Sequence, residues 1–228
     1  GFTGEASIPQ TADRNWNKYQ WFNGTDSVVA LPNDLFNTKA SGAVEFMATV
    51  PSNTSAGFSL ASTTNNNAVF SVGFWNDSGD MRLRLLNIGG NVIQGNTILT
   101  EGAVHTVKFE STGAAYKLYL NGAEETFTVA SGSNNGDWFD TEVDGTMQYS
   151  IGATKRTTGT IQYHAGIISN LSIIDTDLTT VLLNVTGLGN DPWADTIGSN
   201  NGTESGTFTR ELVSASDAND QIDALGNA

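Results

Sequence analysis

The sequence contains no cysteine among its 228 residues. Disulfide bonds, thiolate metal sites and a cysteine nucleophile are therefore excluded. The absence also argues against a small secreted scaffold that depends on disulfides for its stability. A chain of this length can instead bury a sufficient core by itself, because folded proteins of this size bury roughly 70% of the surface of the unfolded chain.

Basic residues are scarce as well. The chain carries 10 lysines and arginines against 24 acidic residues, so its formal net charge is −14. Such a surface repels phosphate backbones, and we expect no nucleic-acid partner. Only 15% of the residues are charged, and Asn, Thr, Ser and Gly supply most of the remaining polarity. This composition favours an extracellular or virion-surface β protein over a cytosolic enzyme.

Long apolar runs are also missing. A membrane-spanning helix needs roughly 18 consecutive apolar residues, and no segment approaches that length, so we expect no membrane insertion. No signal peptide is visible. Because the sequence begins at Gly1 without a methionine, we expect a processed form or a piece of a longer protein.

What the chain has in abundance is short segments of alternating polarity, separated by Asn, Gly, Ser and Asp clusters. This pattern is typical of all-β proteins. The segments follow one another without a Pro- or Ser-rich linker, so we expect one domain over residues 1–213, with residues 214–228 as a C-terminal tail or linker. Many short antiparallel strands in about 200 residues predict a two-sheet antiparallel jelly-roll sandwich.

The best-patterned stretch is "HTVKFESTGAAYKLYLNGAEE", residues 105–125. His105, Val107 and Phe109 fall on one face of a strand, because side chains alternate between the two faces. The dipeptide Asn121-Gly122 is the strongest short-range hairpin signal, since both residues tolerate positive φ. The stretch therefore predicts a meander with one buried face, in which His105 lies at the edge of the core.

Four segments carry a resemblance to a known family. They are "YQWFNGTDSVVALP" (19–32), "GAVEFMATVPS" (42–52), "EGAVHTVKFESTGAAYKLYLNGAEE" (101–125), and the pair "YSIGATK" (149–155) and "IQYHAGIISNLSIID" (161–175). In this order they resemble the laminin-G-like, concanavalin A-like jelly-roll sandwich. The later "DPWADTIGSNNGTESGTFT" (191–209) is similar to the closing strands of phage and bacterial surface versions of the fold. The resemblance implies the fold but leaves function open, because lectins, hydrolases, lyases and adhesion modules share it.

Catalytic members of this fold carry recognisable motifs. Laminarinase-type hydrolases place carboxylates at alternate strand positions, as Glu-x-Asp-x-x-Glu, with the acid and the nucleophile facing one sugar. The nearest stretch runs from Glu142 to Asp144; it lacks the final acid, and Gly145 favours a turn. We interpret it as a solvated acidic loop.

Lyase-type relatives pair a Gln-x-His with an Arg-rich strand and a nearby Tyr. Gln162 and His164 only partly match, and we interpret them as an exposed polar pair. We therefore predict that the protein is not an enzyme. The alternative is a polysaccharide hydrolase or lyase with an unrecognised active site.

Sugar binding needs exposed aromatic side chains with polar neighbours. In "VFSVGFWNDSGDMRLRLL" (69–86), the alternation places Trp75 on the polar sheet face with Arg82 and Arg84. We predict these three residues and Trp138, in an acidic loop, as ligand-binding residues. The alternatives are a solvated strand pair in which arginine covers Trp75, and a Trp138 that is tucked inward.

A calcium ion is the cofactor that this fold type suggests. Asp77 and Asp80 flank a tight Gly turn and offer hard oxygen ligands, so we predict them as metal ligands. Ordinary turn chemistry explains the same residues equally well.

These observations combine into one functional hypothesis. We expect a non-catalytic recognition or structural module of a virion, of the phage fibre or capsid-decoration type, or of a bacterial surface assembly. Its partner would be a glycan or a neighbouring structural protein, and a homo-oligomer is one form that such an adhesion or decoration module can take.

Overall fold

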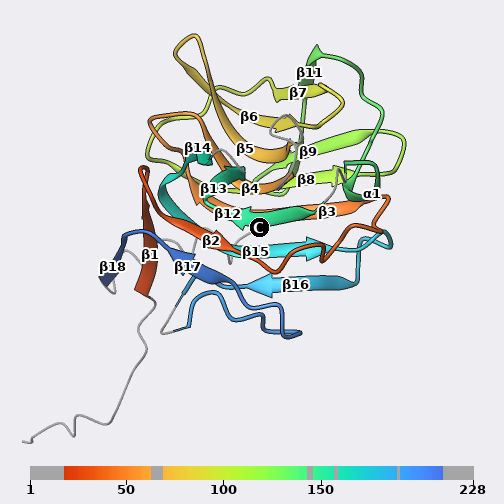
Figure 1. Ribbon diagram of the computed structural model, residues 1–228. Helices are drawn as coiled ribbons and strands as arrows, with labels where there is room; N and C mark the ends of the chain where they lie inside the picture. The colour runs from red at the N-terminus through yellow and green to blue at the C-terminus, as the bar shows by residue number, and fades with distance from the viewer. Residues whose placement is uncertain (1–17, 63–68, 143–145, 157–158, 189–190, 213–228) are drawn as a thin grey trace, which may run out of the picture.

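Two antiparallel sheets face each other in the computed structural model, which describes residues 18–62, 69–142, 146–156, 159–188 and 191–212 (Figure 1). The first sheet has the strand order β10 (Ala123–Glu125), β9 (Tyr116–Leu120), β8 (Val104–Ser111), β3 (Gly42–Thr49), β15 (Ala165–Ile174), β1 (Lys18–Asn23) and β18 (Phe208–Leu212), with β16 (Val181–Val185) also paired to β15.

The second sheet has the order β11 (Phe127–Ser131), β7 (Val92–Gly95), β6 (Asp80–Leu86), β5 (Val69–Asp77), β4 (Ser55–Ser62), β12 (Met147–Ile151), β2 (Val28–Ala30) and β17 (Thr203–Ser205). A short hairpin, β13 (Ala153–Arg156) and β14 (Gly159–Tyr163), forms a third sheet, and one helical turn, α1 (Phe139–Glu142), precedes β12. The predicted all-β jelly-roll sandwich is confirmed. The predicted boundary at residue 213 and the tail 214–228 lie outside the described residues.

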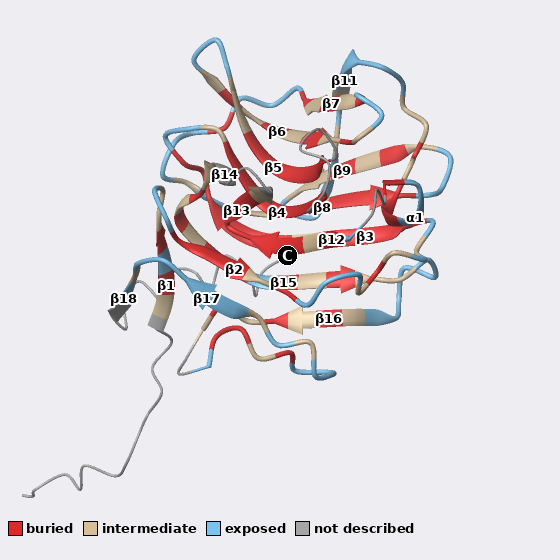
Figure 2. Ribbon diagram, viewed as in Figure 1, coloured by how far each residue is buried: buried red, intermediate tan, exposed pale blue. Residues whose placement is uncertain are grey.

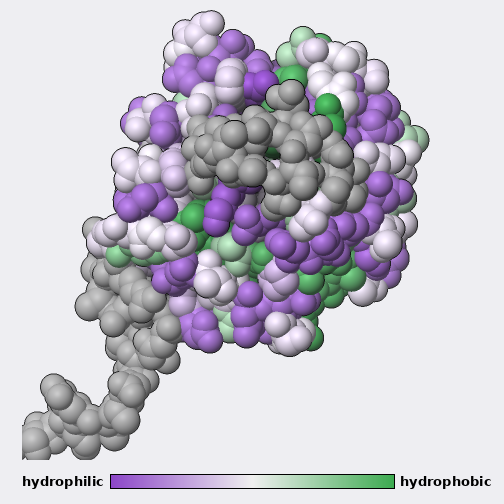
Figure 3. Space-filling view, in the orientation of Figure 1, coloured by the Kyte–Doolittle hydropathy of each residue, from purple (hydrophilic) through white to green (hydrophobic). Residues whose placement is uncertain are grey.

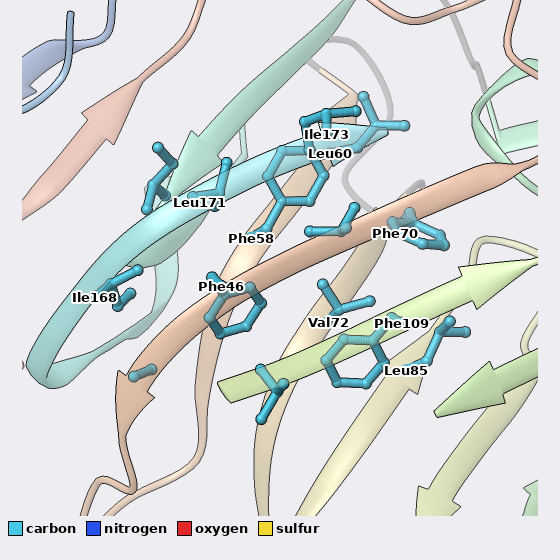
Figure 4. Packing of buried hydrophobic residues seen from close by; sticks show 14 of the residues in the cluster. Phe46, Phe58, Leu60, Phe70, Val72, Leu85, Phe109, Ile168, Leu171 and Ile173 are labelled. Atoms are coloured by element: carbon cyan, nitrogen blue, oxygen red, sulfur yellow. The ribbon is translucent and has the colours of Figure 1, made fainter. Parts of the chain in front are cut away.

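The core lies between the two sheets. Side chains that alternate inward from each sheet meet there and are fully buried (Figure 4). The first sheet contributes Phe46, Phe109, Ile168, Leu171 and Ile173, and the second contributes Phe58, Leu60, Phe70, Val72 and Leu85. Each buried side chain of this size stabilises the fold by about 1.5–3 kcal/mol relative to an exposed one.

The hairpin signals of the sequence are found where they were predicted. Asn121 and Gly122 have φ of 51° and 80° and join β9 to β10, with Leu120 paired to Ala123. This is the two-residue turn with positive φ at both positions that the dipeptide favours. His105 is half-buried near the start of β8, where its Nδ1 accepts a hydrogen bond of 3.0 Å from Asn121 Nδ2.

The second sheet is covered unevenly on its outer face. The β13–β14 hairpin packs against β4, and every residue of β4 is buried (Figure 1). In β6 and β7, by contrast, buried residues alternate with half-buried ones, and β11 is mostly exposed (Figure 2). In β5 every residue from Val69 to Phe74 is buried, and the residues Trp75 to Asp77 beside the turn are half-buried or exposed. The part of this sheet that stays open to solvent is therefore the turn end of β5, together with β6, β7 and β11.

The segment 191–202 closes one end of the sandwich. The indole of Trp193 is buried, packs edge-on against Phe22 at 5.7 Å and donates a 2.6 Å hydrogen bond to Gln20 Oε1. The carboxylate of Asp195 accepts hydrogen bonds from backbone N–H groups, including that of Asn184 at 3.2 Å. These hydrogen bonds fix the position of the loop, which the alternation of polar and apolar residues does not predict.

The close approach of the two sheets can be tested at Gly57. A Cβ at this position would lie 2.2 Å from Phe46 Cζ in the opposite sheet. We expect Gly57→Ala to lower the free energy of unfolding by about 1–3 kcal/mol, because overpacking forces the ring to move. Urea denaturation measures the change.

Two further variants make this test specific. Gly89→Ala is the control, since Gly89 is exposed and its added Cβ would make only ordinary contacts; we expect a change within about 0.5 kcal/mol. Phe46→Leu should cost less in the Gly57→Ala background than in the parent protein, because the smaller side chain relieves the clash. Equal losses at both glycines would contradict the packing described.

Candidate functional site

The β5–β6 hairpin carries the predicted ligand residues. Its turn, Ser78-Gly79, has positive φ at both positions, so β5 and β6 pair in direct register. Trp75 lies opposite Arg82, and Gly73 lies opposite Arg84. Paired residues in antiparallel strands point to the same side, and Phe74 and Leu83 between them are buried in the core. Trp75, Arg82 and Arg84 therefore share the outer face.

Arg84 lies over the ring of Trp75. Its Cζ is 3.7 Å from the centroid of the indole ring, which is the geometry of a cation–π contact. Both side chains are half-buried. The absence of a side chain at Gly73 lets β4 and β5 lie close together, since a Cβ there would clash with the backbone of Ser55 and Gly57. The arginine covers one face of the ring and leaves less of the indole free for sugar stacking than the sequence alone suggests.

Polar groups surround this pair. Arg82 donates to the carbonyl oxygen of Asn96 and, at 3.2 Å, to Asp80 Oδ2. Gln94, next to Arg84 on β7, donates a 2.9 Å hydrogen bond from its Nε2 to Asp77 Oδ2. We call Trp75, Arg82, Arg84 and Gln94 the hairpin surface. The structure brings three of the four predicted ligand residues together on it.

The two predicted metal ligands lie beside the hairpin surface. Asp77 and Asp80 are paired across the turn, but Asp77 accepts from Gln94 and Asp80 forms an ion pair with Arg82. Within the described parts of the chain, no group of three or more His, Asp or Glu side chains could hold a metal ion. A calcium site at this turn stays a prediction; it would need backbone or amide oxygens to complete its ligands.

Trp138 does not belong to the hairpin surface. It is 1% exposed, its ring stacks on Phe139 at 4.8 Å, and it meets Phe70 edge-on at 5.1 Å. The prediction that Trp138 binds a ligand by exposed stacking is wrong for this conformation. The helical turn α1 inserts two adjacent aromatic residues into one end of the core, and strand alternation gives no signal for such a turn.

The prediction that Glu142 belongs to a solvated acidic loop is wrong. Glu142 is buried rather than solvated, and one oxygen of its carboxyl group accepts from the backbone N–H of Ile88. Burial raises the pKa of Glu142 to about 7, and the negative charge of Asp137 acts in the same direction. Residues 143–145 of the proposed motif lie outside the described residues.

His164 is likewise buried, with no exposed surface, although we expected an exposed pair with Gln162. Its Nε2 donates to the carbonyl oxygen of Ile167 at 3.2 Å, which leaves Nδ1 to accept from Ser55 Oγ at 3.0 Å. Both hydrogen bonds suit a neutral imidazole. Burial lowers the pKa of His164 to about 4.

These two buried groups make opposite contributions to stability as pH changes. An unfolded His is protonated below pH 6.5, while folded His164 stays neutral down to about pH 4, so stability falls as the pH drops through this range. An unfolded Glu loses its proton above pH 4.5, while folded Glu142 keeps it to about pH 7, so stability falls as the pH rises. Between pH 4.5 and 6.5 the two effects oppose each other.

Single variants should separate the two effects. In Glu142→Gln, the free energy of unfolding should rise with pH between 4.5 and 6.5 more steeply than in the parent, by up to about 1.4 kcal/mol per pH unit. In His164→Asn it should rise less steeply or fall. Urea midpoints at several pH values in this window measure the slopes, and slopes equal to that of the parent would refute the assignment.

Comparisons with known proteins support the fold. No protein-family model matches the chain, and no curated protein sequence does. Among solved structures, the chain is similar to a putative carbohydrate binding protein from Bacteroides ovatus, with 16% sequence identity and a TM-score of 0.57 over 87% of this chain and 61% of that one. It is also similar to domains LG4-5 of the mouse laminin alpha1 chain, with 12% identity and a TM-score of 0.51 over 92% of this chain and 52% of that one.

This chain thus spans less than two thirds of either structure. The chain has the laminin-G-like, concanavalin A-like jelly-roll fold, as the sequence resemblance implied. At these identities the similarity extends to the fold and not to a ligand.

Proposed function

We propose that the protein is a non-catalytic recognition module of a virion or bacterial surface assembly, and that it binds glycan through the hairpin surface. The observation that carries this proposal is the Trp75–Arg84 stack on the open part of the second sheet. Such an arrangement offers an aromatic ring and hydrogen-bonding groups side by side, which is the combination that sugar C–H faces and hydroxyl groups require.

The shape and polarity of this side of the molecule support the proposal. The surface in Figure 3 is largely hydrophilic, and hydrophobic residues occur in small areas between polar ones. The tip of the β5–β6 hairpin and the β11 segment project separately at one edge (Figure 1). A largely hydrophilic surface suits a saccharide better than it suits an apolar protein partner.

The fold agrees with this role, since a putative carbohydrate binding protein is among the similar solved structures. Presentation outside a cell or on a virion is the setting that we propose for such a module. Within the described residues the longest helix is α1, so no described helix could cross a membrane.

The proposal that the module is non-catalytic rests on the position of Glu142. A polysaccharide hydrolase needs a protonated carboxyl group that touches the sugar. Glu142 has a suitably raised pKa, but it is buried beside Ile88, just after β6 ends, whereas Trp75 lies near the turn at the other end of the hairpin. A perturbed pKa at a buried position with a backbone partner is explained by structure alone.

A glycan array with the purified protein and with Trp75→Ala tests the glycan-binding role. We expect binding by the parent to fall at least about tenfold in the variant, since the loss of an aromatic contact worth about 1.4 kcal/mol corresponds to a factor of ten. Running the array with calcium and again with a chelator also tests the predicted metal site, because binding that needs calcium should be lost on chelation.

Trp21→Ala is the matched control for this experiment. Trp21 is also exposed, at 37%, but it lies in β1 on the outer face of the first sheet. Its removal should leave glycan binding unchanged. Equal losses in both tryptophan variants would contradict the site, and a parent protein that binds no glycan would contradict the function and favour an assembly role.

A further inference from the structure

Arg84 lacks the partners that an arginine normally has. Its guanidinium group donates no hydrogen bond within the described parts of the chain, and its Nε is buried without a partner. Arg82, two residues away on the same strand, instead donates to Asn96 and Asp80. A guanidinium carries five N–H donors and no acceptor. Because the Nε of Arg84 is buried, the donors that it can offer to a ligand are those of its two terminal nitrogens.

The charge balance of the chain makes this unexpected. Acidic residues outnumber basic ones by 24 to 10, and other basic side chains do have acidic partners, as in Lys39–Asp175 at 2.6 Å and Lys108–Glu110 at 2.8 Å. The acid that acts electrostatically on Arg84 is Asp77, but its carboxylate accepts from Gln94. Asp77 therefore has a hydrogen-bond donor in Gln94, and it forms no hydrogen bond with Arg84.

The stack on Trp75 also fixes how Arg84 can meet a ligand. With Cζ 3.7 Å from the ring centroid, the guanidinium is held against the indole before a ligand binds. The N–H groups point outward in the plane of the guanidinium, in a fork that matches the two oxygens of a carboxylate. A preformed fork loses little conformational entropy on binding.

We propose, on the basis of the glycan-binding function above, that the sugar bound at Arg84 carries a carboxylate, as uronic and sialic acids do. Both oxygens of that carboxylate accept hydrogen bonds from the Arg84 guanidinium, while the sugar ring lies beside Trp75. A single carboxylate fits better than a sulfated chain or another polyanion. Asp77 and Asp80 flank the site, and the net charge of −14 repels dense negative charge.

Isothermal titration with defined saccharides tests this proposal. The probes are galacturonic acid oligosaccharides and sialyllactose, each compared with its carboxyl-reduced counterpart, in which the acid is a primary alcohol. We expect at least one acidic probe to bind, and its reduced form to bind about tenfold more weakly or worse, as the loss of a charge-assisted pair predicts.

The variant Arg84→Lys distinguishes the effect of bidentate hydrogen bonding by the guanidinium from the effect of its positive charge. Lysine keeps the positive charge but cannot form the bidentate pair, so we expect about a fivefold or greater loss for the acidic probe and no change for the reduced one. Lys117→Gln removes a positive charge from the outer face of the first sheet and should leave both affinities unchanged. Thermal melting checks that each variant is folded.

The possible failures are distinguishable. Equal binding of the acidic and reduced probes, lost in Trp75→Ala, would overturn the carboxylate assignment and leave glycan binding intact. An acidic preference that persists in Arg84→Lys would place the carboxylate elsewhere and overturn the role of Arg84. Tighter binding of a sulfated polysaccharide such as heparin would overturn the proposed class, and no binding to any probe, together with a silent glycan array, would overturn both proposals.

Discussion

The contact between the two apolar sheet faces is the constraint on which the remaining structure depends. Inward side chains such as Phe46 and Phe58 alternate along each strand, so every strand of the sandwich also presents an outer face that the core does not cover. On the second sheet the β13–β14 hairpin packs against β4, whereas the turn end of β5 and the outward residues of β6 and β7 stay half-buried or exposed. The candidate ligand surface lies on this uncovered part of the second sheet. The absence of a side chain at Gly73 allows β4 and β5 to approach each other there.

Polar groups buried at the ends of the sandwich hold its loops rather than serve chemistry. Asp195 orders the closing segment through backbone N–H groups, and His164 joins Ser55 to the start of β15. Glu142 ties the turn α1 to the end of β6. Each group has a partner that satisfies it, which is the condition under which burying a polar side chain is tolerated. Their shifted pKa values follow from burial in this structural role.

The alternation of polarity in the sequence correctly predicted which residues share a face of a strand. It did not predict which loop residues are buried. The pairing of Trp75 with Arg82, and the turn at Asn121-Gly122, follow from a period of two and from residues that accept positive φ. Trp138 and His164 lie outside strands, where a residue's orientation depends on tertiary contacts that no local pattern encodes. The stacking of Arg84 on Trp75 was one of the alternatives that the sequence left open, whereas the missing hydrogen-bond partner of the Arg84 Nε is a tertiary feature that no local pattern encodes.

The central claim is that the ligand face lies at Trp75 and Arg84. The most direct measurement is a two-dimensional NMR titration of the ¹⁵N-labelled protein with an acidic oligosaccharide, observing the indole N–H signals. The account predicts that the Trp75 signal, assigned from a Trp75→Phe sample, shifts on binding, while those of Trp21, Trp138 and Trp193 stay in place. Shifts confined to Trp21, or a Trp75 signal that does not move while the saccharide binds, would contradict it.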